Sequence, residues 1–391
     1  MSKRYSIFIT ALFCAFIGFF FITNLVVPDR EFSPMENRYL AQKPTLNENS
    51  FKLWNGSFSD FLHGDSRGEF FSGKFMSDYE TYITDQFVGR DLWIAAKAAL
   101  EVGSGKQENN GVYICKEDTL IPRFAEPDNQ RVQNNLNYVN KLVDNVDIPV
   151  YFGLIPGKVS VWRDRLPAHA PNASEADILA NAKESTTAQW VDMDAAMNDH
   201  AGEDIYYRLD HHWTSLGAYY GYAAILEAMG MEAPALDSYE RTTVSTDFNG
   251  TTFSSSGVRW MKPDSIERFV SGDGVTVTAY TTGKPEAGML YDESKLAEKD
   301  KYTYFLGGNK PLAVIETEHT DAPKVLVIRD SYSDALAPFL TDSFSEIHLF
   351  DPRYNKTPVS KYVAENGIDA VLVLYSVANF VSDSNLFVLG Q

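Results

Sequence analysis

The chain has little cysteine and little positive charge. Only two of its 391 residues are cysteine, Cys14 and Cys115. Cys14 lies inside a long apolar segment and Cys115 lies far beyond it, so we expect no disulfide between them and a fold held by a large core. Lysine and arginine total 34 against 53 aspartate and glutamate, a formal charge of −19. This balance argues against nucleic acid as a partner, because phosphate binding needs a basic face.

The negative charge belongs to the part of the chain that follows the N-terminal segment. Residues 1–27 contain two basic residues and no acidic one, which leaves −21 for the other 364 residues. Hydrophobic residues make up 44% and charged residues 22%, as in an ordinary globular protein, and the sequence shows no repeat or low-complexity tract. We interpret the acidity as a solvated surface, which mildly disfavours a strongly anionic polymer as substrate.

The N-terminus carries one long apolar segment. Residues 7–27 are uncharged and rich in Phe, Ile, Leu and Val. As a helix rising about 1.5 Å per residue they cross roughly 30 Å of hydrocarbon. Lys3 and Arg4 precede the segment, so we expect residues 1–6 in the cytoplasm and the body of the chain outside it. A cleavable signal peptide is the alternative, although residues 23–27 lack a small-x-small cleavage site.

The rest of the chain alternates helices and apolar strands. Residues 28–75 show little periodicity and are interpreted as a membrane-proximal spacer, and residues 76–391 as the main domain, which opens with broken helices. Strands are expected at 111–115, 150–155, 204–209, 324–328, 346–350 and 370–374, and helices at 129–147, 176–189, 194–200, 215–229, 332–337 and 359–366. This alternation predicts an α/β fold with a mostly parallel sheet covered on both faces. The Thr-, Ser- and Gly-rich residues 240–320, with strand-like stretches such as 302–305, are expected to be a β-rich insertion.

Two polar clusters follow predicted strands. Asp210, His211 and His212 come directly after one strand, and Ser331 stands in the turn between another strand and a helix. In open α/β sheets binding sites collect at the carboxyl ends of strands, so we expect both clusters there. A serine nucleophile needs a hydroxyl, an imidazole that takes its proton and a carboxylate that orients the imidazole. Because side chains alternate along a strand, Asp210 and His212 are expected to point to the same side.

Other interpretations of these residues stay open. Asp330 or Ser331 can be a simple helix cap. Asp210 and the two histidines are also metal-ligand types, with His200 as a distant fourth, but adjacent histidines are expected to project apart, and no H-E-x-x-H or cysteine pair supports zinc. Trp213 is either a packing residue or a substrate platform. We therefore expect neither a metal nor a cofactor.

The Asp-His-His-Trp at residues 210–213 resembles the signature of the bacterial DHHW protein family, which looks related to the SGNH-hydrolase-like proteins of alginate O-acetylation. Other stretches are similar to the same family, so that the likeness runs over most of residues 34–380: 35–41, 85–90, 109–114, and 155–158 with 166–167. The resemblance implies an SGNH-hydrolase-like (flavodoxin-like) three-layer domain. It also implies a permuted order of catalytic elements, because the Asp-His element precedes the serine.

The resemblance further implies an activity and a site. It assigns Ser331 as nucleophile, His212 as general base and Asp210 as the residue that orients it. Relatives of this type move acetyl groups onto, or remove them from, an extracellular or cell-envelope glycan, as O-acyltransferase or O-acyl esterase. A membrane-bound O-acyltransferase is the implied acyl-donor partner. The alternative is a non-catalytic glycan-binding or assembly protein of a polysaccharide modification or export system.

Further residues are candidate substrate or oxyanion contacts. The backbone N–H groups of Ser331 and Tyr332 are expected to point outward at the start of a helix and to stabilise an oxyanion. Asn379 follows the last strand, and Lys158 lies in a Pro-Gly-Lys loop. Arg329 stands where the relatives have glycine, so it either crowds the turn or binds an anionic group.

Overall fold

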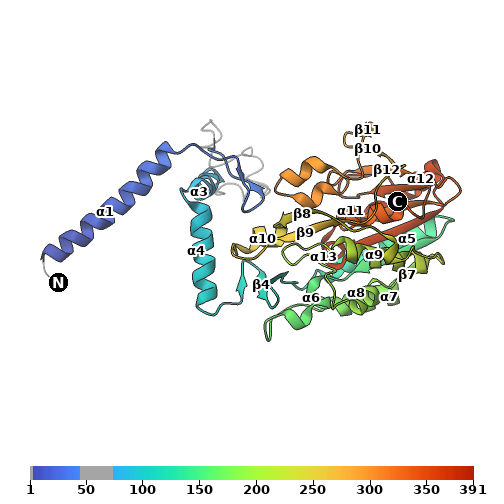
Figure 1. The fold of residues 1–391 in the computed structure, drawn as a ribbon, viewed down its shortest axis with the longest axis horizontal. Helices are drawn as coiled ribbons and strands as arrows, with labels where there is room; N and C mark the ends of the chain where they lie inside the picture. The colour runs from blue at the N-terminus through green and yellow to red at the C-terminus, as the bar shows by residue number, and fades with distance from the viewer. Residues whose placement is uncertain (1–2, 45–73) are drawn as a thin grey trace, which may run out of the picture. The chain divides into compact units, whose positions relative to one another are not determined.

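The computed structural model describes residues 3–44 and 74–391 (Figure 1). The chain forms two compact units, residues 1–104 and residues 105–391. The first unit is built of helices that follow an apolar N-terminal helix, and the second is built around a large sheet.

The first unit begins with α1 (Lys3–Val26), a 24-residue helix that is long and apolar enough to cross a membrane. This helix contains nearly all of the span predicted at residues 7–27. The unit continues with a short antiparallel strand pair and two helices: β1 (Phe32–Ser33), β2 (Arg38–Tyr39), α3 (Lys74–Gln86) and α4 (Arg90–Gly103). Most of the predicted spacer at 28–75 falls on residues 45–73, outside the described residues.

Asp85, near the end of α3, joins the pieces of this unit. Its buried carboxylate accepts hydrogen bonds from the guanidinium of Arg38 (2.8 and 2.5 Å) and from the backbone N–H of Ala41 (2.8 Å). The hydrogen bond from Arg38 lowers the pKa of Asp85. The segment that follows α1 is therefore tied to α3.

A mixed eight-stranded sheet forms the centre of the second unit. The strands lie in the order β11 (Glu286–Ala287), β10 (Thr276–Ala279), β12 (Leu312–Glu316), β14 (Glu346–Phe350), β13 (Lys324–Arg329), β15 (Ala370–Ser376), β6 (Val150–Ile155) and β7 (Gln189–Val191). The five strands from β14 to β7 are parallel, and the other three add antiparallel at one edge. The predicted α/β fold with a mostly parallel sheet is confirmed.

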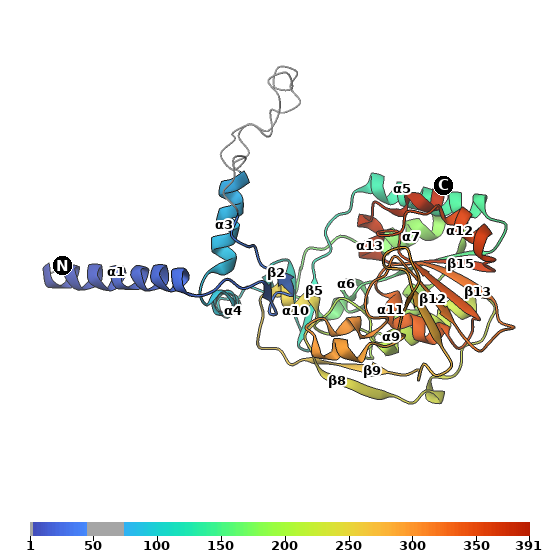
Figure 2. The same ribbon diagram turned by 90° about the horizontal axis from the view of Figure 1, so that it is seen from above.

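Alternate residues of each parallel strand pack into two separate cores. In β13, Val325 and Val327 belong to one apolar cluster, and Leu326 and Ile328 belong to the other. The first face is covered by α8 (Met193–Asp199), α9 (Ser215–Ala228) and α11 (Ser333–Leu340). The second face is covered by α5 (Asn129–Asn145), α7 (Glu175–Ser185), α12 (Val359–Asn366) and α13 (Val377–Ser382), as Figure 2 shows. Strands that are apolar on both faces need helices on both sides of the sheet.

The helices that follow the neighbouring strands β13 and β15 pack on opposite faces of the sheet. α11 follows β13 on the first face, and α13 follows β15 on the second. Open α/β sheets bind ligands at such switch points, beyond the carboxyl ends of the strands. Counted from β13 and continuing from β15 to β6, the five parallel strands have the order 2-1-3-4-5, which is the flavodoxin-like order.

Residues 240–320 contain five strands that pair antiparallel. β8 (Thr242–Phe248) pairs with β9 (Asp264–Arg268), and α10 (Thr251–Ser256) lies between them in sequence. β10, β11 and β12 join the central sheet instead. The segment is thus rich in strands, and its description as an insertion stays a prediction.

Short elements complete the second unit. They are β3 (Glu108–Asn109), β4 (Val112–Cys115), β5 (Thr119–Pro122), α6 (Lys158–Val161) and the 3₁₀ helices η2 (Arg163–Arg165), η3 (Leu236–Ser238), η4 (Glu293–Ala297), η5 (Lys301–Tyr304) and η6 (Leu386–Gly390). Of these, β4 agrees with the strand predicted at 111–115.

Two local predictions are wrong. Residues 204–209 form only an isolated bridge between Tyr206 and Trp213, and the N–H of Leu209 donates to the carboxylate of Asp264 (2.8 Å). Residues 302–305 lie largely in the 3₁₀ helix η5. The short strand β7 is missed, since the helix predicted at 176–189 ends at Ser185. In these places contacts with distant residues override the local apolar pattern.

Glu175 is expected to make the stability of the second unit depend on pH. Its buried carboxylate accepts from the N–H of Gly157 (2.7 Å) and so joins the loop after β6 to α7. Burial raises the pKa of Glu175 from 4.5 to about 7, so the folded chain holds this proton more tightly than the unfolded chain. Stability from this group therefore falls, by at most about 3 kcal/mol, as pH rises from about 4.5 to about 7.

The comparison of wild type with Glu175→Gln measures the pH-dependent stability that Glu175 contributes, because glutamine keeps an acceptor for the N–H of Gly157 but does not ionise. In thermal melts between about pH 4.5 and about pH 7.5, the melting temperature of the wild type should drop by several degrees more than that of the variant. Parallel curves for the two proteins would contradict the prediction.

Candidate active site

Ser331 lies in the turn between β13 and α11, at the carboxyl edge of the sheet. The buried side chain of Asp330 holds this turn. Its Oδ1 accepts from the N–H of Tyr332 (3.0 Å), and its Oδ2 accepts from the N–H and hydroxyl of Ser376 (2.9 and 2.7 Å). Nδ2 of Asn379 donates to the same Oδ2 (2.7 Å). One carboxylate therefore ties the serine turn to the end of β15 and the start of α13.

Asp210 and His212 lie in a tight turn rather than on a strand. Oδ1 of Asp210 accepts from the backbone N–H of His212 (3.0 Å) and lies 2.6 Å from its Nδ1. A side chain that bonds the backbone two residues on is the arrangement of an Asx-turn. The two side chains therefore meet as expected, but through this turn and not through alternation along a strand.

His212 joins the two turns. Its Nε2 lies 2.8 Å from Oγ of Ser331. An ionised carboxylate can only accept hydrogen bonds, so the ring nitrogen next to Asp210, Nδ1, carries the proton. Nε2 of the neutral ring then accepts a hydrogen bond from the hydroxyl of Ser331. Asp210 and His212 are buried, whereas Ser331 is partly exposed. The three side chains form a hydrogen-bonded row whose hydroxyl end is reached by solvent.

Asp210 stays ionised in this setting. Burial alone would raise its pKa, but the electrostatic interactions with the imidazoles of His211 and His212 and the hydrogen bonds from His212 hold the pKa well below its usual value. Thr251 adds two donors to Oδ2 of Asp210, its N–H (2.6 Å) and its hydroxyl (2.8 Å). An anion fixed from both sides can orient the imidazole and stabilise its protonated form.

Tyr302, from η5, supports the row from the other side. Its ring stacks on that of His212, with centroids 3.7 Å apart and planes 6° from parallel. Its hydroxyl donates to the carbonyl of Ser331 (3.1 Å). Burial raises the pKa of Tyr302 well above its usual value, so the hydroxyl remains a donor. One side chain thus contacts both the imidazole and the serine turn.

Two N–H donors stand beside the serine. Among the described residues, the backbone N–H of Ser331 has no hydrogen-bond partner. Nδ2 of Asn379 donates one hydrogen to Asp330, the residue before the serine, and carries a second. Donors of this kind stabilise the oxyanion of acyl transfer when they face it.

Residues 148–350 match the family model described as DHHW protein, and this stretch is just over half of the chain. The chain belongs to the DHHW protein family. The resemblance seen in the sequence is therefore confirmed, and the matched stretch includes Asp210, His212 and Ser331 but not Asn379. A comparison with curated proteins gave no match.

Solved structures share the fold of this DHHW chain. A DHHW family protein from Eubacterium siraeum DSM 15702 is 25% identical, covers 72% of this chain and 95% of its own, and has a TM-score of 0.62. Bacillus cereus PatB1, solved with a sulfonyl adduct, is 20% identical, covers 70% and 96%, and has a TM-score of 0.57. The O-acetyltransferase domain of Pseudomonas putida AlgJ is 16% identical, covers 70% of this chain and 93% of its own, and has a TM-score of 0.45.

Trp213 and Tyr332 are packing residues rather than substrate contacts. Nε1 of the fully buried Trp213 donates to the carbonyl of Tyr332 (2.8 Å), and a Cβ added at Gly221 of α9 would stand 2.6 Å from its ring. Tyr332 donates its N–H to Asp330 and its hydroxyl to the carbonyl of His211. Of the two interpretations of Trp213, the structure favours packing over a substrate platform. The predicted oxyanion N–H at Tyr332 is wrong, because this N–H already donates to Asp330. In this DHHW protein the two residues lock the serine turn to the histidine turn.

Lys158 and Arg329 are also buried. Nζ of Lys158 donates to three backbone carbonyls, those of residues 120, 207 and 208 (2.6, 3.0 and 3.1 Å), and burial lowers the pKa of Lys158 to about 8. Arg329 is fully buried and pairs with Asp334 in the first turn of α11. Neither side chain faces a substrate, so the predictions of a glycan contact at Lys158 and an anion contact at Arg329 are wrong. Asn379 is partly exposed and remains a candidate oxyanion donor.

Asp210, His211 and His212 also bring metal-ligand atoms together. These atoms lie within 4.8 Å of one another, and the histidine rings lie 3.8 Å apart, so the expectation that the histidines project apart is wrong. The same atoms already make hydrogen bonds: His212 with Asp210 and Ser331, and Nδ1 of His211 with Oγ1 of Thr251 (2.7 Å). A metal ion would have to replace these bonds. The metal interpretation stays an alternative that a chelator tests.

Four residues that support the site were not predicted from the sequence. They are Thr251, Tyr302, Ser376 and Gly250, where a Cβ would stand 2.3 Å from Asp210. Ser376 ends β15, two residues beyond the strand predicted at 370–374, and the strand-end rule that pointed to Ser331 also points to this position. Nothing in the spacing links the other three to Asp210 or His212, because they lie in the segment whose local structure was predicted least well. Three of the four residues that were not predicted therefore lie in residues 240–320.

Proposed function

We propose that this DHHW protein transfers or hydrolyses O-acyl groups, acetyl above all, on a cell-envelope glycan or a secreted polysaccharide. The observation that carries the proposal is the row in which Asp210 bonds Nδ1 of His212 (2.6 Å) and Nε2 of the same ring bonds Ser331 (2.8 Å). α1 serves as an uncleaved anchor with its N-terminus in the cytoplasm, so that the second unit works outside it.

The first half-reaction acylates the serine. As Oγ of Ser331 attacks the acyl carbonyl carbon, its proton passes to Nε2 of His212, and the ionised Asp210 stabilises the imidazolium. The oxygen of the tetrahedral intermediate takes up negative charge, and the N–H of Ser331 and the second N–H of Asn379 are the donors for it. Collapse of the intermediate breaks the bond to the leaving oxygen or sulfur, which takes the proton from Nε2. The products are acyl-Ser331 and the free leaving group.

The second half-reaction removes the acyl group by the same route in reverse. His212 takes the proton of an attacking hydroxyl, the tetrahedral intermediate forms again, and Ser331 leaves with the proton returned by Nε2. A glycan hydroxyl as attacker makes the protein an O-acyltransferase, and water makes it an esterase. In the transferase case, a membrane-bound O-acyltransferase is the proposed acyl donor.

Chain order and fold support an SGNH-like assignment. The Asp-His element precedes the serine in sequence, and the strand order is flavodoxin-like only when counted from β13, the strand that leads to Ser331. We therefore propose a permuted SGNH-like domain, with residues 240–320 inserted between its two elements. The structure of Bacillus cereus PatB1 contains a sulfonyl adduct. Sulfonyl fluorides modify activated serines, so they are suitable reagents for testing Ser331.

Trapping the acyl-enzyme tests the proposal. The full chain in detergent is incubated with an aryl acetate, quenched in acid and digested, and the acetyl group is located by mass spectrometry. We expect acetyl on Ser331, and a sulfonyl fluoride that modifies the same residue should stop turnover. Acetyl on Ser331 that disappears when a glycan acceptor is added, with acetylated glycan formed, identifies the transferase.

Two other outcomes would replace the proposal. Loss of turnover with EDTA and its recovery with zinc would favour a metal held by Asp210 and the histidines. Neither turnover nor an adduct, with retained binding to a polysaccharide, would favour the non-catalytic glycan-binding function.

A further inference from the structure

The helices that follow α1 expose large apolar side chains in a regular pattern. On α3, Met76 and Ile83 are 67% and 47% exposed, and on α4, Trp93 and Leu100 are 47% and 75% exposed. Each pair is spaced by seven residues, which places both members on one face of the helix. Each helix thus presents an apolar stripe that the described part of the chain leaves uncovered.

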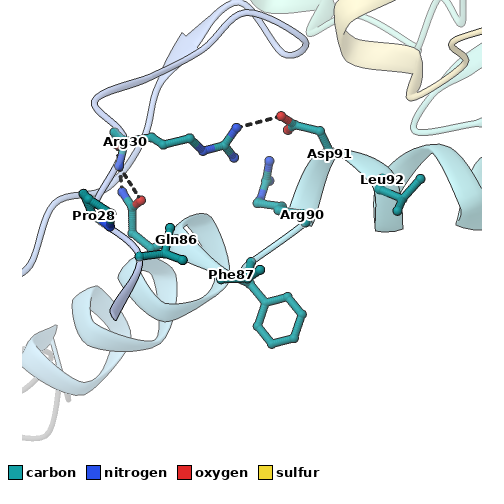
Figure 3. Close-up of a pocket in the computed structure, with 10 residues that line it drawn as sticks. Pro28, Arg30, Gln86, Phe87, Arg90, Asp91 and Leu92 are labelled. Atoms are coloured by element: carbon teal, nitrogen blue, oxygen red, sulfur yellow. Dashed lines mark hydrogen bonds and ion pairs between the residues drawn. The ribbon is translucent and has the colours of Figure 1, made fainter. Parts of the chain in front are cut away.

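These stripes begin where the helices contact α1. The ring of Phe20 in α1 stacks on Phe87 (centroids 5.4 Å apart) and lies 6.0 Å from Trp93. The side chain of Asn24 accepts from the backbone N–H of Val88 (2.8 Å) and so fixes the turn between α3 and α4 to the end of α1. Figure 3 shows Phe87 pointing away from the paired side chains of this turn. The contact of α1 with the turn between α3 and α4 therefore consists of aromatic packing and one hydrogen bond to the backbone of Val88.

The depth of this contact places both helices at a membrane surface if α1 spans the bilayer. Phe20 lies six residues before the end of α1, which is about 9 Å along the helix axis at about 1.5 Å per residue. Interfacial amphipathic helices bury their apolar faces to a depth of about 5–10 Å, which matches this contact. Within this unit α3 lies crosswise to α1 in Figure 2, and α4 is inclined to α1 in Figure 1. A helix that lies crosswise to a membrane-spanning helix runs along the membrane plane.

Apolar cavities continue the same surface. One of about 420 Å³ is lined by residues of α3 and α4, including Ile83, Trp93 and Lys97, and one of about 520 Å³ lies between Trp93 and the Phe-rich side of α1. Lys97 is 62% exposed in its side chain and is on the stripe of Trp93 and Leu100. A lysine in this position covers apolar surface with its stem and keeps its ammonium at the headgroups.

We infer that α3 and α4 are a pair of interfacial helices that bind the outer surface of the lipid bilayer through the stripes of Met76 and Ile83 and of Trp93 and Leu100. This helix pair makes α1 part of a membrane-embedded unit rather than a simple tether. Residues 76–103 contain two basic and five acidic residues, and Arg30 and Arg90 pair with Asp91 and Glu36. Binding therefore comes from apolar burial and not from attraction to anionic headgroups. The inference rests on the proposed retention of α1 and not on the chemistry of Ser331.

Site-directed spin labelling of the full chain in phosphatidylcholine nanodiscs tests this inference. Labels are placed at Leu100→Cys and Met76→Cys, with Cys14 and Cys115 replaced by serine. Matched controls are Ala99→Cys and Thr81→Cys, which are exposed on other sides of the same two helices. We expect the ratio of oxygen to water-soluble nickel accessibility to be several-fold higher at the stripe positions than at the controls. Anionic lipid should leave these ratios unchanged.

Three results would overturn the inference. Equal, water-like ratios at all four positions would show that the stripe faces solvent. Low accessibility to both reagents at Leu100 and Met76 would show that a second copy or another protein covers it. A ratio that rises only with anionic lipid would assign the contact to headgroup charge. Turnover of an aryl acetate by the same labelled chains is measured in parallel, so failure of the proposed function is seen separately.

Discussion

Ser331→Ala is expected to abolish turnover of an aryl acetate by the full chain, with a loss in kcat on the order of 10⁴-fold or more. In the proposed mechanism the hydroxyl that bonds Nε2 of His212 becomes acylated, and among the described residues no other hydroxyl bonds this nitrogen. His212→Ala should cost a similar factor, and the double variant no more than either single one, because the two residues act as a unit. Steady-state kinetics of the three variants measure this.

Ser333→Ala is the matched control for this prediction. Ser333 lies two residues further on in α11, and its buried hydroxyl has no hydrogen-bond partner in the described part of the chain. Its removal should leave kcat within a few-fold of the wild type. Full activity in Ser331→Ala, or an equal loss in Ser333→Ala, would refute the assignment of the nucleophile.

Gly250→Ala is expected to lower kcat by on the order of 10²-fold without removing any functional group, since a misplacement of about 1 Å can have this effect. A Cβ at this position would stand 2.3 Å from both Cβ and Oδ2 of Asp210. The carboxylate would have to move, and it would lose the two hydrogen bonds from Thr251 and its alignment with His212.

Gly202→Ala separates this effect from a general response to added volume. A Cβ at Gly202 meets nothing within 4 Å. This variant should keep wild-type kinetics, and thermal melts should show that both glycine variants remain folded. A Gly250→Ala protein that is folded and fully active would show that the position of Asp210 does not limit the reaction.

Much of the fold follows from local patterns. The apolar run of β13 is a short-range signal, and the strand predicted from it is confirmed. The helix predicted at 215–229 is also found, and the Thr214 hydroxyl caps it (3.3 Å to the N–H of Gly217). The wrong predictions at residues 204–209 and 302–305 share a cause. There the backbone and aromatic side chains make contacts with distant residues, such as Leu209 with Asp264 and Tyr302 with His212. A local pattern cannot report such contacts.

Local patterns along the chain suffice to predict the apolar N-terminal helix, the parallel strands and the three residue types that acyl transfer needs. The contact between His212 and Ser331, 119 residues apart, depends on the fold of the whole unit. The burial of Trp213, Lys158 and Arg329, which makes them supports rather than substrate contacts, also depends on that fold. Residue type and spacing define which chemistry is available. Which side chains meet, and which remain exposed, depends on strand order and packing over the whole unit.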